Sequence, residues 1–165
     1  MTAVVFRRNN LKKKMRILLV VDDSASSADV VETVVDRSWP ADTMVRVLSI
    51  AAPVRAELHF RHDTLELAQK EMTRNAESLT ARVTDFLRTE GLSVDSAVAF
   101  GDAASQIVNE AQQWQANFVL LGANSYTAEG EEPRGVAQSV VNHAPCKVEI
   151  VEQEAAALER EIHDG

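Results

Sequence analysis

The sequence predicts an α/β fold, a three-layer sandwich whose central sheet has five mostly parallel strands. Short aliphatic runs alternate along the chain with longer segments in which apolar residues recur every three or four positions. The first pattern is typical of strands buried on both faces, and the second of amphipathic helices. Strands separated by helices need crossover connections, which place helices on both faces of a parallel sheet.

The first expected strand covers residues 17–21, a continuous aliphatic run. The aspartates and serine at 22–24 follow it and offer oxygens that could cap a helix. A helix is expected next, because apolar residues recur at helical spacing until Pro40 stops it. These residues are Ala28, Val31, Val34 and Val35. Residues 45–50 then form the second strand, and residues 54–62 a linker.

The longest helix is expected over residues 63–90. Its apolar residues step by three and four along an otherwise charged segment, and they are Leu65, Ala68, Met72, Ala76, Leu79, Val83 and Phe86. Gly91 stands where a left-handed C-terminal cap belongs. At 1.5 Å per residue this helix would extend about 40 Å, enough to cross a whole domain.

The remaining elements continue the alternation. Residues 92–100 are the third strand, and Asp102 is the expected N-cap of a helix that turns Ile107, Val108 and Ala111 inward. Residues 118–121 are a fourth aliphatic strand that ends at Gly122. A polar loop over 123–134, a short helix over 136–142 and a fifth strand over 148–151 complete the order.

The composition fits one globular domain. The chain has 165 residues, of which 45% are hydrophobic and 25% charged. We expect the domain over residues 15–151, between a basic extension at 1–14 and an acidic tail at 152–165. The net charge of −8 leaves an acidic body that repels phosphate backbones, so no nucleic-acid partner is expected.

A single cysteine, Cys146, excludes a disulfide within the chain and fits a reducing compartment. No apolar run approaches the roughly 20 residues that span a bilayer. We therefore expect a cytoplasmic protein without a membrane partner. His59 and His62 share a loop with no cysteine near them, a pattern that is more often solvated than metal-binding.

Ligands of such sheets bind beyond the carboxyl ends of the strands. Those ends are expected at residues 21–23, 50–51 and 121–122. The sequence has no phosphate-binding P-loop, no Gly-x-Gly-x-x-Gly and no Gly-x-Ser-x-Gly. With no evident catalytic or metal-binding residues, the chain is expected not to be an enzyme.

Asp22 and Asp23 also permit a second hypothesis, because receiver domains of response regulators resemble this pattern and hold Mg²⁺ with such carboxylates. That hypothesis needs a phosphoacceptor aspartate at the end of a later strand, where this chain has Gly122. Asp102 is better explained as a helix cap, and Lys147 would then have no phosphoryl group to contact. The receiver hypothesis is the least favoured.

Three blocks in order resemble the universal stress protein family. They are ILLVVDDSASS after Arg16, GDAASQIVNEAQQWQANFVLLGANS from Gly101, and VAQSVVNHAPCKVEIV, which ends at Val151. The resemblance implies the Rossmann-like fold of the adenine-nucleotide alpha-hydrolases and a binding or regulatory role in the stress response. It also implies an adenosine site formed by Val20, Val21, Asp22, Ile50, Leu121, Gly122 and Asn124. For Asp22, a ligand contact and a plain strand-end cap both remain open.

ATP-binding members of that family carry a Gly-x2-Gly-x9-Gly-(Ser/Thr) loop. Here Gly122 fits the first glycine and Ser125 replaces the second. The third is either Gly135, followed by Val136 instead of a hydroxyl residue, or Arg134, followed by Gly135. The loop is altered in both registers, so ATP or AMP binding is expected to be weak or lost.

The charges of this loop also disfavour ATP. Glu129, Glu131 and Glu132 would each oppose a triphosphate by about 1 kcal/mol at 4 Å in water, and Arg134 offsets only one of them. An ATP- or AMP-binding member with slow hydrolysis remains the alternative, since helix amides are still available and a metal ion could bridge the acids to phosphate.

The resemblance further implies a homodimer that pairs through the last strand. An exposed edge strand invites such pairing. Val148, Ile150 and Val151 would form the edge here. A regulatory partner is also implied, but its chemistry is unknown.

Overall fold

A computed structural model describes residues 14–51, 62–126 and 134–152 of the chain. The expectations for the basic extension, the linker and the acidic tail therefore lie almost wholly outside the described residues. The three glutamates of the polar loop, and His59, lie outside them too.

The described part contains one five-stranded sheet with the order β3-β2-β1-β4-β5. The central strand β1 (Arg16–Val20) lies between β2 (Met44–Ala51) and β4 (Phe118–Gly122), with β3 (Ser93–Phe100) and β5 (Lys147–Val151) at the two edges. All four pairings are parallel. The predicted fold class is confirmed, and each strand begins and ends within one residue of its predicted bounds.

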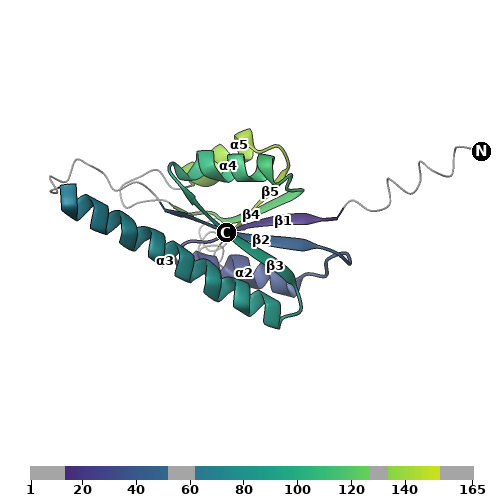
Figure 1. The fold of residues 1–165 in the computed structure, drawn as a ribbon. Helices are drawn as coiled ribbons and strands as arrows, with labels where there is room; N and C mark the ends of the chain where they lie inside the picture. Colours follow the sequence, from purple (N-terminus) through teal and green to yellow (C-terminus); the bar gives the residue numbers. More distant parts are fainter. Residues whose placement is uncertain (1–13, 52–61, 127–133, 153–165) are drawn as a thin grey trace, which may run out of the picture.

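Helices cover both faces of this sheet, as Figure 1 shows. The helices α2 (Ser26–Asp36) and α3 (His62–Thr89) lie on one face, and α4 (Ala103–Gln113) and α5 (Gly135–His143) lie on the other. Two buried clusters fill the two interfaces. The predicted three layers are therefore present.

The aliphatic run of β1 supplies both clusters. Ile17, Leu19 and Val21 pack toward α2 and α3, whereas Leu18 and Val20 pack toward α4 and α5, and all five are 0% exposed. A strand between two helical layers has no polar face, which is why its sequence is continuous rather than alternating. Each such side chain contributes about 1.5–3 kcal/mol by burial.

Two predicted helix boundaries are confirmed by their caps. The Asp102 carboxylate accepts a hydrogen bond from the backbone N–H of Ser105 at 3.1 Å, and Gly91 after α3 has a φ of 89°. The expected cap of α2 is wrong. Ala25 holds its N-cap position and makes no side-chain cap bond, because alanine has no side-chain oxygen. The Asp22 carboxylate bonds Ser24, Ser27 and Tyr126 instead.

The predicted inward face of α3 is wrong at its C-terminal end. Phe86 is 47% exposed, whereas Leu87 is 0% exposed and belongs to the core. Ala76, Thr80 and Thr84 are buried along the same line as Leu87. Two residues of the buried face are threonines, so a pattern of apolar residues alone does not identify that face.

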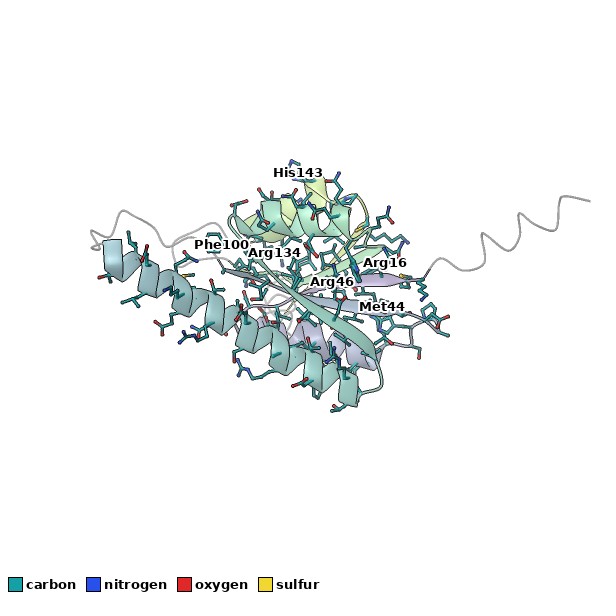
Figure 2. The ribbon with its side chains drawn as sticks, viewed as in Figure 1. Arg16, Met44, Arg46, Phe100, Arg134 and His143 are labelled. Carbon is teal, nitrogen blue, oxygen red and sulfur yellow. The ribbon has the colours of Figure 1, made fainter. Side chains whose placement is uncertain are left out.

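No helix of the described residues is both long enough and apolar enough to cross a membrane. The two ends of the sheet differ in character. Met44 begins β2 and Phe100 ends β3, and Figure 2 shows them at opposite ends of the sheet. The Phe100 end is the carboxyl edge, where the chain leaves all five parallel strands.

Candidate functional site

The strand order reverses between β1 and β4, because the chain moves outward from β1 to β2 and β3, and then returns to β4 on the other side. In open α/β sheets ligands bind at the carboxyl edge beside this reversal. Asp22 follows β1 there, and Gly122 ends β4. The candidate site is therefore built around these two strand ends.

Both carboxylate oxygens of Asp22 are engaged by the protein. Oδ1 accepts from the backbone N–H of Ser24 at 3.0 Å and from the hydroxyl of Ser27 at 2.9 Å, and the Ser24 hydroxyl donates to it as well. Oδ2 accepts from the backbone N–H of Tyr126 at 2.9 Å. Asp22 thus ties the start of α2 to the turn after β4, and a ligand at this carboxylate would compete with these donors.

The hydroxyl of Tyr126 stands between β1 and β2. It donates to the carbonyl oxygen of Val21 at 2.5 Å and accepts from the backbone N–H of Ile50 at 2.8 Å. The N–H of Val21 still donates to the Leu48 carbonyl at 2.9 Å. In a parallel ladder the next bond would join the Ile50 N–H to the Val21 carbonyl. The phenol is therefore inserted into the first open position of that ladder.

The position of Tyr126 has an energetic cost. Its φ of 58° is left-handed, which costs a non-glycine residue roughly 1–2 kcal/mol. Burial raises the pKa of its hydroxyl to about 12, although hydrogen bonds with Ser49 and Ile50 act in the opposite direction. The phenol is accordingly neutral at physiological pH, and it serves both as a donor and as an acceptor.

A cavity of about 230 Å³ opens beside this phenol, and we call it the strand-end cavity. The strand ends and α3 line it, with Asp22, Asp23, Ser49, Ile50, Ala51, Met72, Asn75, Ala76, Leu79 and Tyr126. A larger groove of about 780 Å³ runs between α2 and α3 and shares Asp22, Asp23 and Leu79 with it. The exposed ring of Phe86 lines that groove.

The end of β4 is closed by a buried serine. The Ser125 hydroxyl accepts from the backbone N–H of Gly122 at 3.0 Å, and Ser125 is 1% exposed. A Cβ at Gly122 would stand 3.0 Å from the Ser26 Oγ and 3.1 Å from the Ser125 Oγ. The packing of two serines therefore leaves little room for a side chain at Gly122, independently of any ligand.

Comparison with known families settles the class of protein. A model of the universal stress protein family matches residues 14–152. The chain belongs to the universal stress protein family. A comparison with curated protein sequences gives no match.

Solved structures of universal stress proteins share the fold. One from Lactobacillus plantarum has a TM-score of 0.71 and 18% identity, with 85% of this chain and 99% of that chain covered. An Arabidopsis thaliana family member with AMP bound has a TM-score of 0.63 and 14% identity, covering 87% and 95%. A protein from Archaeoglobus fulgidus in complex with dAMP has a TM-score of 0.55 and 18% identity, covering 82% and 96%.

This universal stress protein brings together only part of the expected adenosine site. Asp22 and Ile50 line the strand-end cavity, and the Val21 carbonyl faces the same phenol. Val20 and Leu121 are 0% exposed inside the sheet, and Asn124 is exposed on the turn. None of these last three is among the residues that line the cavity.

The start of α5 holds the other expected residues. Arg134 precedes the helix with a left-handed φ of 67°, and its guanidinium forms an ion pair with Glu152. Gly135 begins the helix with open space around its Cα, and Val136 packs against the core. Because the glycine-favouring conformation belongs to Arg134, the geometry favours the register in which Arg134 replaces the third loop glycine. Figure 2 labels Arg134 on the carboxyl side of the molecule.

Sequence reasoning missed Tyr126 and the α3 residues that line the strand-end cavity. Tyr126 is the only tyrosine of the chain and follows the strand-end Gly122 by four residues. A lone aromatic residue in an otherwise polar loop was the available signal. Met72, Asn75 and Leu79 gave no signal, because their approach to the strand ends depends on where α3 crosses the sheet.

The other chemical candidates find no support among the described residues. Lys147 pairs with Phe118 at the amino end of β5, so it lies at the opposite edge from Asp22, against the receiver hypothesis. Burial raises the pKa of the Cys146 thiol, which disfavours the reactive thiolate. The part of the chain that the structure describes contains no group of three or more residues suited to hold a metal ion.

Proposed function

We propose that this universal stress protein is a regulatory binding module that binds the adenosine part of an adenine nucleotide and contributes little binding energy to its phosphates. ATP binding is then weak or lost. One observation carries the proposal: the Gly122 amide, the first amide of the family's phosphate loop, is already bonded to the buried Ser125 hydroxyl.

Adenine nucleotides are the proposed class of ligand for two reasons. The Arabidopsis and Archaeoglobus relatives carry AMP and dAMP in their solved structures. The strand ends of this chain offer a backbone donor at Ile50 and a backbone acceptor at Val21. Such a pair can read a heterocyclic base without any charged side chain.

The phosphate side supports weak binding of ATP. Ser125 fills the space where a glycine would allow the close approach of a phosphate. Arg134 is the only basic residue in the sequence from 122 to 136. It is paired with Glu152, so a phosphate would have to displace that carboxylate. Both features reduce the binding free energy that each added phosphate contributes.

Calorimetric titration with adenosine, AMP and Mg-ATP tests this proposal. We expect the three dissociation constants to agree within a few fold. A preference for ATP of about tenfold or more, about 1.4 kcal/mol, would contradict it and favour an ATP-binding member with slow hydrolysis. Ser125→Gly should strengthen ATP binding relative to adenosine, whereas Asn124→Gly, at the exposed neighbouring position, should not.

We also propose that two copies associate through β5. Among the residues that the structure describes, this strand pairs only with β4. The Val151 carbonyl accepts from the Ala123 N–H on the β4 side, so the alternation of a strand turns the main-chain groups of Val148 and Ile150 to the free edge. A second β5 can add there by main-chain hydrogen bonds.

Light scattering on a sizing column tests the dimer. We expect a dimer at micromolar concentration. Ile150→Pro removes an outward N–H without breaking the β4 ladder, so it should give a monomer. Ile150→Ala removes more of the side chain than the proline substitution does but keeps the N–H, and should remain a dimer. A monomeric unmodified protein would refute the proposal.

A further inference from the structure

The open position between β1 and β2 is filled by a side chain of the same protein. The hydroxyl oxygen of Tyr126 lies between the Ile50 N–H and the Val21 carbonyl. It is 2.8 Å from the Ile50 nitrogen and 2.5 Å from the Val21 oxygen. Among the described residues, the Ser49 hydroxyl is a further neighbour of this oxygen, at 3.4 Å. The two backbone groups are therefore fully occupied.

These two backbone groups have the pattern that an adenine edge would complete. Adenine presents a ring-nitrogen acceptor beside an exocyclic amino donor, and the two strands offer an N–H donor beside a C=O acceptor. A phenol satisfies the same pair with one atom, because its oxygen accepts while its hydrogen is donated. Tyr126 thus makes the polar contacts that a bound base would make.

The size of the strand-end cavity agrees with this occupation. Its volume of about 230 Å³ is below the roughly 300–1,000 Å³ of ordinary ligand pockets. The ring of Tyr126 forms part of its wall and packs against the core on the α4 side of the sheet. Removal of this ring would enlarge the cavity and uncover the two backbone groups together.

We propose that Tyr126 is an internal occupant of the nucleobase position, so that a nucleoside binds only after the phenol has left Val21 and Ile50. The choice of adenosine as the ligand rests on the proposed function. The apparent affinity is then lowered by the fraction of molecules in which the ring has moved out. Tyr126 determines ligand access through the groups it covers.

The backbone around Tyr126 holds the ring in place. Its N–H is anchored on Asp22 Oδ2 at 2.9 Å, while its left-handed φ of 58° opposes the arrangement. The high pKa of the hydroxyl follows from the same burial. The conformation in which Tyr126 covers Val21 and Ile50 is therefore stabilised by specific hydrogen bonds and opposed by its strained backbone.

Calorimetric titration of three variants with adenosine and AMP tests this inference. Tyr126→Ala should bind about tenfold more tightly than the unmodified protein, or tighter still. Tyr126→Phe, which keeps the ring but frees the backbone pair, should show a smaller gain. Phe100→Ala is the control, since it removes an exposed aromatic ring at the same edge of the sheet but outside the lining of the cavity, and its affinity should be unchanged. Failure of both Tyr126 variants to gain affinity overturns the inference.

Fluorine NMR gives an independent readout, because 3-fluorotyrosine labels the single tyrosine of the chain. The ligand-free protein should give a resonance displaced from that of the free amino acid. Millimolar AMP should move it toward the free value in proportion to the bound fraction. A resonance already at the free value without ligand overturns the inference, even if a variant fails to fold.

The two proposals can fail separately. The proposed function is judged by the ratio of ATP to adenosine affinity within one protein. The occupation by Tyr126 is judged by the ratio of adenosine affinities between Tyr126→Ala and the unmodified chain. A variant that gains adenosine binding and also prefers ATP strongly would refute the first proposal and support the second.

Discussion

The backbone N–H of Tyr126 donates to Oδ2 of Asp22 at 2.9 Å, across 104 positions of sequence. This bond joins the ends of β1 and β4, the two strands between which the sheet order reverses. It places the phenol over β1, where its hydroxyl reaches the Val21 carbonyl and the Ile50 amide. One carboxylate thereby organises the whole carboxyl edge around the candidate site.

Asp22→Asn is expected to destabilise the fold by about 2 kcal/mol, because charge-assisted bonds to Ser24, Ser27 and Tyr126 are weakened together. Urea denaturation measures the difference. Asp23→Asn, at the exposed neighbour, is the matched control and should stay within about 0.5 kcal/mol of the unmodified protein. Equal effects of the two substitutions would show that Asp22 does not organise this edge.

The stability of the fold should fall as the pH rises from about 10 to 12. The unfolded phenol of Tyr126 ionises near pH 10, but burial raises its pKa to about 12 in the folded protein. The unfolded state therefore releases its proton first in this window, and unfolding is favoured by up to about 2 kcal/mol.

Denaturation of Tyr126→Phe alongside the unmodified protein isolates this effect, since all other titrating groups are shared. The difference in unfolding free energy between the two proteins should shrink with rising pH, because the tyrosine protein alone loses this contribution. A difference that stays constant from pH 8 to the alkaline limit would mean that the phenol is solvated.

Gly122 and Gly135 should respond oppositely to alanine. Gly122→Ala places a Cβ 3.0 Å from the Ser26 Oγ and 3.1 Å from the Ser125 Oγ, which should cost about 1–3 kcal/mol. Gly135→Ala meets nothing within 4 Å at the start of α5, and it should be neutral or stabilise by up to about 1 kcal/mol. Thermal unfolding distinguishes them, and a destabilised Gly135→Ala would be unexpected for open space.

Arg46 on β2 should be sensitive to a lysine substitution. Its guanidinium forms two hydrogen bonds with Asp95, at 2.9 and 3.0 Å, and one with Glu110 at 2.9 Å. It also lies 4.6 Å from the centre of the Trp114 ring. Figure 2 labels Arg46 beneath α4. Lysine can reproduce neither the planar fork nor the stacking, so Arg46→Lys should cost about 1–2 kcal/mol.

Arg37→Lys is the control for this substitution. Arg37 pairs with Glu149 at 2.5 Å, but both side chains are more than a third exposed, and such pairs contribute about 0–1 kcal/mol. Urea midpoints should therefore change little for Arg37→Lys and clearly for Arg46→Lys. If the two substitutions shift the midpoint alike, the ring of Trp114 and the second carboxylate at Arg46 contribute nothing measurable.

Periodicity together with cap and stop residues was sufficient for the fold class and for all nine described elements. The reason is local: ILLVV can be buried on both faces only between two layers, Asp102 begins α4 through its side-chain cap, and Gly91 ends α3 through its left-handed backbone. Phe86 shows the limit. Its spacing matched the stripe of α3, yet Leu87 is buried instead, because the buried line continues through Thr80 and Thr84, whose polarity hides it.

The parallel sheet, the placement of Asp22 and Gly122 at its carboxyl edge, and the family resemblance from which we propose a nucleotide site there were all available from the sequence. Only the tertiary structure decided what stands at that edge. Tyr126 and Ile50 are 76 positions apart, and no periodicity relates them. Their hydrogen bond forms because the ladder between β1 and β2 ends where the turn after β4 passes. The Ile50 N–H and the Val21 carbonyl are unpaired there, and buried backbone groups need a hydrogen-bond partner, which the Tyr126 hydroxyl supplies.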